Sequence, residues 1–291
     1  TPMPPQPAVA AQAFRWPDRM SFTFASWNIN SIRARAHLVQ DWLERHPECD
    51  LLCLQEIKCE DSQFPAVFKD AGYHVATTGQ KAYNGVAFIG RRPFDVTTHT
   101  LPGFDDPTAR YIECELDGLT IGNLYLPNGN SGGEDGYSKK LAFFEALAVR
   151  GKEFLESEKS FAFIGDYNVC PTDEDLAPKA LSPTDALVRP ETRAAFHRLQ
   201  WLGLTDALRA VHPTGRHYTF WDYQAAAFQR NSGLRIDHAL LSPRVTERLV
   251  SFTIDRDERS AEKASDHVPV IVTLRYATKK AAPFQGAAFP F

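Results

Sequence analysis

Polar side chains capable of acid–base chemistry and metal binding follow several apolar runs of this sequence. They are Asn28 and Asn30 after FTFASW, Glu56 after DLLCLQ, Tyr125 and Asn128 after IGNL, Asp166 and Asn168 after FAFIG, Asp237 after LRI, and Asp266 with His267 before VPVIVTL. Loops at strand ends are where a rigid scaffold presents reactive groups. Carboxylates gathered in one place repel each other unless a cation joins them, and oxygen ligands of this kind suit Mg²⁺. The pattern therefore predicts a magnesium-dependent site.

Each of these residues has a more ordinary explanation when it is taken alone. An Asp or Asn after a strand is most often a turn-former or a helix cap, and a single Tyr or His there more often packs. The interpretation as a site rests on their joint occurrence and on two fixed pairs, Asp166-x-Asn168 and Asp266-His267. Histidines without such company, such as His37 and His197, are predicted to be structural or exposed.

The elements that must position these residues are short apolar strands and amphipathic helices. Strands are predicted at 21–27, 50–54, 85–89, 111–116, 120–126, 160–164, 234–241 and 268–274. Helices are predicted at 32–45, 63–71, 138–155 and 193–210. The first helix carries its apolar residues on one face, as expected for a helix that covers a sheet. The predicted fold class is therefore an α/β layered domain.

The chain is predicted to form a single domain over residues 20–276. This stretch has no long linker, low-complexity block or internal repeat. Residues 1–19, rich in Pro and Ala, and residues 277–291 are expected to be flexible tails. Phe284, Phe289 and Phe291 in the second tail could also pack or bind a partner.

The composition argues against several classes of protein. With 32 Lys+Arg against 36 Asp+Glu in 291 residues, the net charge is -4, which disfavours a nucleic-acid binder held by bulk positive charge. No apolar run approaches the ~18 residues that span a bilayer. The five cysteines are odd in number and lack paired C-x-x-C spacing, so reduced thiols in a reducing compartment are expected.

Seven strings of the sequence resemble motifs of the exonuclease III family of abasic-site DNA repair nucleases, part of the endonuclease/exonuclease/phosphatase superfamily. They are WNINSIRAR (27–35), LCLQEIK (52–58), NGVAF (84–88), LYLPNG (124–129), FIGDYNVCPTD (163–173), GLRIDHALLS (233–242) and SDHVPV (265–270). The match is colinear from about Phe22 to Tyr276. The resemblance implies a four-layer α/β sandwich, with two facing mixed β-sheets flanked by helices and an active site at one edge.

The resemblance also implies roles for the motif residues. The residues implied to bind Mg²⁺, or Mn²⁺ in its place, are Glu56, Asn30 and Asp266. The residues implied to hold and polarise the scissile phosphate are Asn28, Tyr125 and Asn168. Asp166 matches the carboxylate that activates water or protonates the leaving oxygen, and His267 matches the histidine that faces the phosphate, with Asp237 as its partner. The sequence leaves open which of the two is the base; we favour Asp166, with a protonated His267 stabilising charge.

The substrate implied is double-stranded DNA with abasic sites or blocked 3′ ends. Lys58 and Arg110 are the favoured candidates for phosphate contacts, and Arg33, Arg216 and Arg235 are either further contacts or solvated charge. In the family, a pocket for a flipped, base-free sugar is lined by residues that match Phe220, Trp221, Leu234 and Ile236. Flipping costs least where the base is already missing. Trp221 is almost as typical of a core aromatic. The Gly-rich loop 129–137 contains no Arg, so no basic wedge is expected there.

The expected function is Mg²⁺-dependent hydrolysis of the phosphodiester 5′ to an abasic site, leaving a 3′-OH, with 3′→5′ exonuclease and 3′-phosphatase or phosphodiesterase activity. Two alternatives stay open. One is another phosphodiesterase or phosphatase of the superfamily acting on a non-DNA substrate, which the pocket aromatics disfavour. The other is a DNA-binding protein without catalysis, which would have no need of the polar residues. A monomer without a membrane is expected, in a bacterial-type cytoplasm near the nucleoid.

Overall fold

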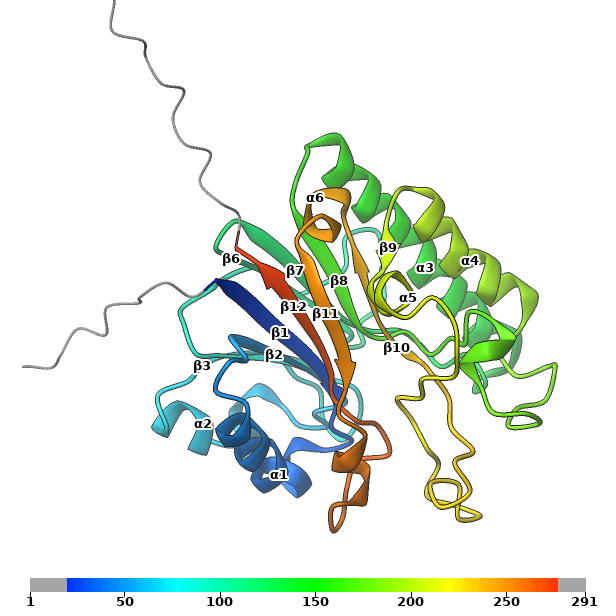
Figure 1. Ribbon diagram of the computed structural model, residues 1–291, viewed down its shortest axis with the longest axis horizontal. Helices are drawn as coiled ribbons and strands as arrows, with labels where there is room; N and C mark the ends of the chain where they lie inside the picture. Colours follow the sequence, from blue (N-terminus) through cyan, green and yellow to red (C-terminus); the bar gives the residue numbers. More distant parts are fainter. Residues whose placement is uncertain (1–19, 277–291) are drawn as a thin grey trace, which may run out of the picture.

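The protein is described by a computed structural model in which residues 20–276 form four layers (Figure 1). Two six-stranded mixed sheets face each other, and helices cover the outer face of each sheet. The predicted four-layer α/β sandwich is thus confirmed. The expected tails, 1–19 and 277–291 with their phenylalanines, lie outside the described residues.

The first sheet has the strand order β11–β12–β1–β2–β4–β3. Its strands are β1 Ser21–Asn28, β2 Leu51–Gln55, β3 His74–Thr78, β4 Val86–Gly90, β11 Leu249–Ile254 and β12 Val270–Arg275. β1 and β2 run parallel, and α1 (Ile32–Arg45) connects them across the outer face. The remaining neighbours in this sheet are antiparallel.

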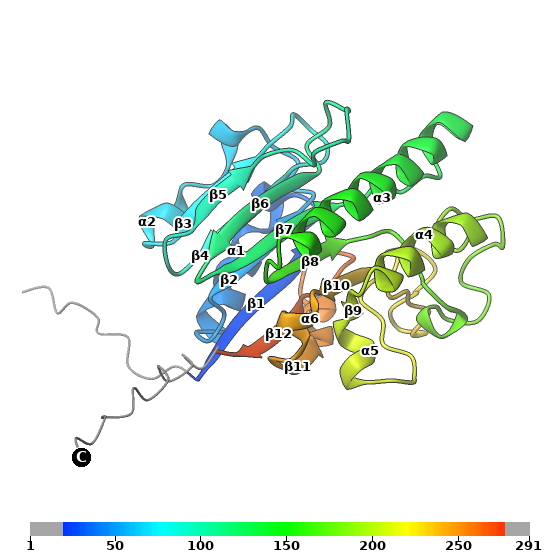
Figure 2. The ribbon, with the colours of Figure 1, turned by 90° about the horizontal axis from the view of Figure 1, so that it is seen from above.

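The second sheet repeats this plan with the order β5–β6–β7–β8–β10–β9. Its strands are β5 Asp95–Thr98, β6 Tyr111–Leu116, β7 Leu119–Tyr125, β8 Phe161–Asp166, β9 Thr205–Asp206 and β10 Asp237–Leu241. Here β7 and β8 are the parallel pair, connected by α3 (Gly133–Glu156). α4 (Pro190–Trp201) packs beside α3 on the same outer face (Figure 2).

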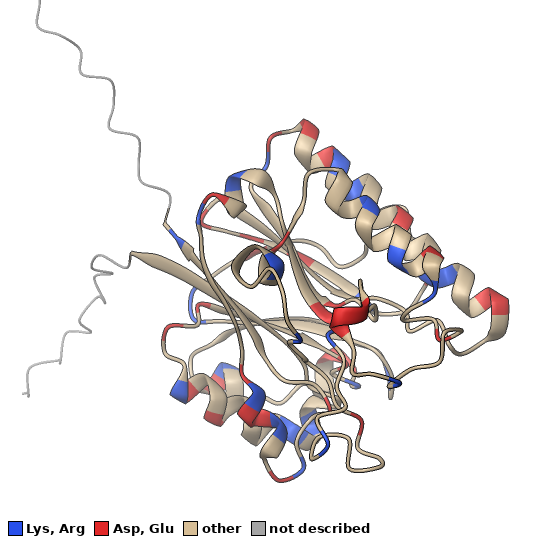
Figure 3. Ribbon diagram, turned by 45° about the vertical axis from the view of Figure 1, so that its right-hand side comes forward, with Lys and Arg blue, Asp and Glu red and all other residues tan. Residues whose placement is uncertain are grey.

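Apolar clusters fill the spaces between the layers. Phe22 and Phe24 of β1 point between the two sheets, whereas Ala25 and Trp27 belong to the cluster under α1. The strand's period of two accounts for this alternation. A further cluster, which includes Leu147 of α3, lies between the second sheet and its two helices. Acidic and basic residues are interspersed along the helices (Figure 3).

The two parallel strand pairs bring four strand ends to one place in the molecule. The carboxyl ends of β1 and β2 lie at one edge of their sheet, and those of β7 and β8 lie at the facing edge of the other. A buried polar contact joins the sheets nearby. Gln55 Nε2 donates to Asn123 Oδ1 (2.9 Å), and Asn123 Nδ2 donates to the backbone of Leu54 and Ala87. This link fixes the sheets relative to each other one residue before Glu56.

Two predicted elements are divided in the structure. The helix expected at 193–210 ends at Trp201, because Gly203 has φ +116, and the chain continues as β9 and the short helix α5 (Ala207–Val211). The helix expected at 63–71 is reduced to a 3-10 turn, Asp61–Gln63, and to α2 (Val67–Asp70), with Pro65 between them.

Other boundaries also differ. The strand expected at 234–241 begins only at Asp237, and α3 begins at Gly133, inside the expected loop 129–137. Strands β3, β5 and β11 were not predicted because polar residues interrupt their apolar runs. The short helix α6 (Pro243–Thr246) completes the described elements.

The cysteines and the helix lengths bear on two expectations. All five cysteines are buried free thiols, as predicted. Within residues 20–276, no helix combines the length and the apolar character needed to cross a membrane.

Candidate active site

Four predicted site residues stand at the carboxyl ends of the two parallel strand pairs. Asn28 ends β1, Glu56 follows β2, Tyr125 ends β7 and Asp166 ends β8. Because parallel strands share the direction in which they end, each pair delivers two side chains to one edge. The facing sheets then bring the two edges together, so the sequence pattern of polar residues after apolar runs marks one place in space.

The carboxamide of Asn28 links the two sheets at this edge. Its Nδ2 donates to Glu56 Oε1 (2.8 Å) and to Asp166 Oδ2 (2.9 Å), and its Oδ1 accepts from the Asn30 N–H (3.1 Å). Both amide hydrogens therefore bond to carboxylates. In this structure Asn28 lies between two acidic groups and bonds to both. To donate to a phosphate, as the family resemblance implies, it would have to give up one of these two bonds.

His267 and Asp237 form a buried pair beside Asp166. His267 Nδ1 lies 2.8 Å from Asp237 Oδ2, and its Nε2 lies 3.6 Å from Asp166 Oδ2. Both carboxylates are fixed by the antiparallel register of β8 and β10, in which Asp166 is opposite Asp237. Thr219 Oγ1 accepts from the Asp237 N–H (3.2 Å) and holds the start of β10 in place. The imidazole is therefore oriented by one carboxylate and presented to the other.

Burial and neighbouring charges set the pKa values of this group. Burial, the largest influence on Asp166, acts with the repulsion of Asp237 and Glu56 against the attraction of His267 and raises the pKa of Asp166 to about 7. Burial alone would lower the pKa of His267, but the Asp237 and Asp166 carboxylates raise it to about 10. Asp166 can therefore exchange a proton near neutral pH while His267 stays a cation.

The crowding of carboxylates fits a hard divalent cation. Glu56, Asp166 and His267 offer ligand atoms that all lie within 4.8 Å of one another. The charged imidazole of His267 is a poor ligand, so the carboxylate oxygens of Glu56 and Asp166 are the donors that suit such an ion. Burial, with repulsion from Asp237 and Glu56, raises the pKa of Asp166, and a bound cation would favour its ionised form.

Two other predicted metal ligands lie close to this group without joining it. Asn30 Oδ1 accepts from Lys58 Nζ (2.6 Å), and Asn30 Nδ2 donates to the Tyr223 hydroxyl (3.2 Å). Burial raises the pKa of Asp266 and repulsion by Glu56 adds to this, although His267 opposes it. The ligand roles of both residues stay predictions.

Two cationic side chains flank the site, one beside Glu56 and the other beside Tyr125. Lys58 Nζ lies 3.2 Å from Glu56 Oε2. The Arg110 guanidinium lies 4.9 Å from the centre of the Tyr125 ring, and its Nη1 donates to the Tyr125 carbonyl (3.3 Å). Burial, followed by the charges of Glu56 and Asp166, keeps the pKa of the Tyr125 phenol well above its usual range. The phenol is thus a hydrogen-bond donor at the pH where the site would work.

Asn168 ties together the loops that follow β7 and β8. Its backbone N–H donates to Asp166 Oδ1 (2.9 Å), and its Nδ2 donates to the Leu126 carbonyl (2.8 Å). Its Oδ1 accepts from Asn128 Nδ2 (3.4 Å). Asn168 has φ +47, a left-handed conformation that Asn tolerates better than most residues. Its side chain therefore shapes the loop rather than projecting freely from it.

Of the four residues predicted to line the sugar pocket, two border a cavity and two are buried in the core. The Phe220 ring lies 5.0 Å from the His267 ring, and Phe220 and Leu234 border a cavity of about 210 Å³. Trp221 is only 1% exposed and packs against Tyr218 and Phe228, so its interpretation as a core aromatic is the correct one in this structure. Ile236 is also buried, which makes it a support of the cavity wall.

Sequence reasoning missed two residues that hold the site. The Tyr223 hydroxyl accepts from Asn30 Nδ2 and donates to the Ala264 carbonyl (2.8 Å). Ser265 Oγ donates to the Asn28 carbonyl (2.6 Å) and accepts from the His267 N–H (3.2 Å). Tyr223 lies two residues after Trp221, and Ser265 opens the SDHVPV motif, so nearness to residues already singled out was the available signal.

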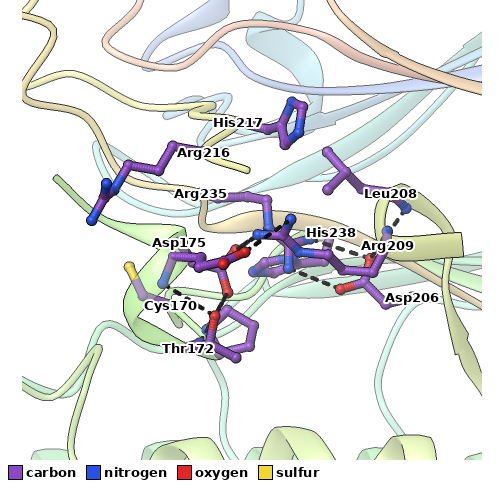
Figure 4. Close-up of polar contacts among 12 residues, drawn as sticks. Cys170, Thr172, Asp175, Asp206, Leu208, Arg209, Arg216, His217, Arg235 and His238 are labelled. Atoms are coloured by element: carbon purple, nitrogen blue, oxygen red, sulfur yellow. Dashed lines mark hydrogen bonds and ion pairs between the residues drawn. The ribbon is translucent and has the colours of Figure 1, made fainter. Parts of the chain in front are cut away.

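A second cluster of charged residues surrounds Arg235 and contains none of the residues described so far for the site (Figure 4). Arg235 is 1% exposed; its Nε donates to Asp175 Oδ1 (2.6 Å) and its Nη2 to Asp206 Oδ2 (2.9 Å). Arg209 Nη2 donates to the same Asp175 oxygen (2.7 Å). Burial lowers the pKa of the adjacent His238 to about 4. Arg235 is therefore neither a phosphate contact nor solvated charge, the two possibilities expected from sequence, because its guanidinium neutralises buried carboxylates.

Comparison with known proteins gives a consistent result. The model of the Endonuclease/Exonuclease/phosphatase family matches residues 25–267. Exodeoxyribonuclease III of Haemophilus influenzae is 34% identical over 265 residues, which cover 85% of this chain and 97% of that protein. Two solved structures each cover 88% of this chain and 100% of their own, with a TM-score of 0.82. They are a 3′ phosphatase from Neisseria bound to a product DNA hairpin, at 36% identity, and an AP endonuclease from Archaeoglobus fulgidus, at 33%.

Proposed function

This chain belongs to the endonuclease/exonuclease/phosphatase family, and from that premise we propose that it hydrolyses the phosphodiester bond 5′ to an abasic site in duplex DNA, leaving a 3′-OH. In its broader class it is a phosphodiester-hydrolysing DNA repair nuclease, like the exodeoxyribonuclease III to which it is similar. One observation carries the proposal: Asn28 bridges Glu56 and Asp166 while the His267–Asp237 pair faces the same Asp166.

The reaction needs a proton acceptor, a stabiliser of negative charge and a way to hold the phosphate. Asp166, with a pKa raised to about 7 by burial, is suited to take a proton from water or return one to the leaving oxygen. His267, kept charged by Asp237, supplies a fixed positive charge toward the phosphate oxygens. The Tyr125 phenol, which stays protonated, can donate to the same oxygens.

A divalent cation completes the proposed site. Glu56 and Asp166 would hold it, with Asn30 and Asp266 close by. Mg²⁺, or Mn²⁺ in its place, supplies a positive charge that polarises the phosphate and stabilises the charge that develops during hydrolysis. Lys58 is already 3.2 Å from Glu56, so this side chain balances part of the negative charge and can move to a neighbouring phosphate when the cation binds.

Selection for damaged DNA would come from the cavity beside Phe220. An apolar wall formed by Phe220, Leu234 and Leu181 suits a sugar without its base, and extruding such a sugar costs less than extruding an intact nucleotide. The same catalytic groups would also act on blocked 3′ ends. Similarity to the 3′ phosphatase from Neisseria supports this second activity, and similarity to an exodeoxyribonuclease III supports 3′→5′ exonuclease action.

The setting of this activity is also a proposal. We propose that the protein acts on duplex DNA as a monomer. Similarity to the exodeoxyribonuclease III of a bacterium supports a place in the cytoplasm beside the chromosome.

A labelled duplex with one tetrahydrofuran abasic mimic tests the proposal, incubated with the protein in Mg²⁺ or in EDTA. We expect metal-dependent incision 5′ to the mimic and little cutting of the matched intact duplex. Duplexes with a recessed 3′ end and with a 3′-phosphate, run in parallel, rank the activities at ends. The absence of incision at the mimic, with hydrolysis of a non-DNA phosphodiester instead, would favour the other branch of the superfamily.

A further inference from the structure

Lys140 is a fully buried cation that lies under the two loops carrying the catalytic residues. It belongs to α3 and is 0% exposed. Its Nζ donates to the backbone carbonyl of Asn128 (2.9 Å) and to that of Asn168. One of these carbonyls belongs to the loop after β7 and the other to the loop after β8. A single ammonium group therefore joins the loop of Tyr125 to the loop of Asp166.

This lysine is not neutralised as other buried cations of the protein are. Arg235 is paired with two carboxylates, whereas no ion pair within residues 20–276 involves Lys140. Burial, opposed mainly by the charge of Asp166, lowers the pKa of Lys140 to about 7. Burying a charge without a counter-ion opposes folding. A side chain kept under these conditions needs an explanation other than stability.

The loop above is shaped to fit the lysine. Gly129 has φ +88, and a Cβ at this position would lie 2.7 Å from Lys140 Cδ and 3.1 Å from Ala186 Cβ. The aliphatic stem of Lys140 therefore occupies the volume that a side chain at 129 would need. The glycine and the lysine form one packed unit beneath the phosphate-holding end of β7.

The contacts of Lys140 continue directly to the catalytic carboxylate. Asn168, whose carbonyl Lys140 binds, donates its backbone N–H to Asp166 Oδ1 (2.9 Å) and its Nδ2 to the Leu126 carbonyl (2.8 Å). Asn168 also holds a left-handed conformation, which must be imposed by its surroundings. Removing the ammonium would release the carbonyl that fixes this turn.

We infer that Lys140 is a positioning residue of the reaction: its buried ammonium holds the loops after β7 and β8 at the separation at which Asp166, Asn168 and Tyr125 act together. The kinetic test of this inference rests on the proposed nuclease function. The test by amide hydrogen exchange rests only on the contacts described above. The inference assigns no contact with DNA to Lys140.

The test compares Lys140→Met with Lys152→Met, a matched change on the exposed side of the same helix, where Lys152 is ion-paired with Glu156. On the abasic duplex, we expect Lys140→Met to lower kcat by about 10- to 100-fold with KM changed less than about threefold, since small displacements of reacting groups cost rate rather than binding. Lys152→Met should match the wild type. Equal kcat for wild type and Lys140→Met would overturn the inference.

Amide hydrogen exchange supplies a readout that does not depend on activity. In Lys140→Met, the amides of Leu126 and Asn168, which bond to the backbone and side chain of Asp166, should exchange at least about tenfold faster than in Lys152→Met. Unchanged exchange at both amides would refute the inference even if the wild type proved inactive on DNA, an outcome that would separately refute the proposed function.

A second variant covers the case in which Lys140→Met does not fold. Gly129→Ala keeps the ammonium but places a methyl group 2.7 Å from its stem. We expect the same loss of kcat and the same faster exchange at Asn168. Wild-type exchange and kcat in this variant would count against the inference.

Discussion

The protein has two buried clusters of charged side chains that lie next to each other in the sequence, since Arg235 belongs to one and Asp237 to the other. Around Arg235 the charges balance, because two aspartates pair with two arginines. Around Asp237 they do not, because Lys58 and His267 are the only cations of residues 20–276 that form ion pairs with Glu56, Asp166, Asp237 or Asp266. The same residue types therefore produce two different environments.

The pKa shifts express this difference. In the balanced cluster, the arginines outweigh burial and lower the pKa of both Asp175 and Asp206. In the unbalanced cluster, burial raises the pKa of Asp166 to about 7 and that of Asp266 above its usual range, whereas for Glu56 the hydrogen bond from Asn28 and the charge of Lys58 outweigh burial and lower the pKa. A lowered carboxyl pKa stabilises the fold, whereas a raised one leaves a group that reacts with protons and attracts a cation. Charge balance, more than residue type or burial, separates a structural cluster from a catalytic one.

The largest effect should follow from Asp166→Asn, which removes the reactive carboxylate. We expect kcat on the abasic duplex to fall by about 10³-fold or more, because no other described group can replace it in proton transfer. The thermal midpoint should stay the same or rise, since repulsion with Asp237 and Glu56 is relieved. Steady-state kinetics and thermal unfolding of the same preparation measure both. Near-normal turnover would show that another group moves the proton.

Arg235→Met should lower the stability of the protein by about as much free energy as Asp166→Asn takes from catalysis. Two buried carboxylates would lose their main counter-ion, so the free energy of unfolding should fall by about 3–5 kcal/mol. Arg244→Met is the control, because its pair with Glu158 is exposed and such pairs contribute about 0–1 kcal/mol. Urea unfolding compares the variants, and kcat per folded molecule should change little. A stable but inactive Arg235→Met protein would contradict the separation of the two clusters.

Asp237→Asn should have a smaller effect on rate than Asp166→Asn. It leaves the imidazole in place but removes the carboxylate that contributes most to raising the pKa of His267. We expect kcat to fall by about 10- to 100-fold. The activity should also be lost at a lower pH than in the wild type, because His267 would lose its proton earlier as the pH rises. A pH–rate profile tests this, and an unchanged alkaline limb would argue against a catalytic imidazolium.

The smallest effect should be on the pH dependence of protein stability, to which Asp175 and Asp166 contribute with opposite signs. It is measured in EDTA. Asp175 has a folded pKa below its unfolded value of about 3.9, so its contribution is fully present above about pH 5 and is lost progressively as the pH falls through 3.9 toward the folded pKa. Asp166 has a folded pKa of about 7, so ionisation costs stability as the pH rises from about 4 to 7. Asp175→Asn should therefore flatten the acid limb, and Asp166→Asn the slope between about pH 4 and 7. Parallel curves for the two variants would contradict the opposite signs.

Much of the site could be predicted because its residues are local to strand ends. Asn28, Asp166 and their neighbours each follow an apolar run, and a run of that kind shows where a side chain leaves the sheet. The fold class followed from the same periodicity, and the four-layer arrangement from family resemblance. The periodicity and the family motifs both lie within short stretches of chain, so they can be recognised in the sequence itself.

What could not be predicted depends on contacts between distant segments. The burial of Trp221 depends on packing against Phe228, and the pairing of Arg235 depends on Asp206, which lies in β9. The bridge made by Asn28 uses both hydrogens of its amide, a geometry that composition does not reveal. For the same reason, the expected helix at 193–210 was too long: its helical period continued past Gly203, whose left-handed conformation ends it.

The order of the strands has a consequence for the newly made protein. Within residues 20–276, Asn28 lies on the first strand and His267 precedes the last, which pairs with that first strand. The complete set of catalytic groups cannot form until residue 267 has left the ribosome and its strand has joined the sheet. We therefore expect nascent and truncated chains that lack this strand to be unable to cut DNA. The proposed active site stays incomplete until the residues that follow His267 have been made and paired.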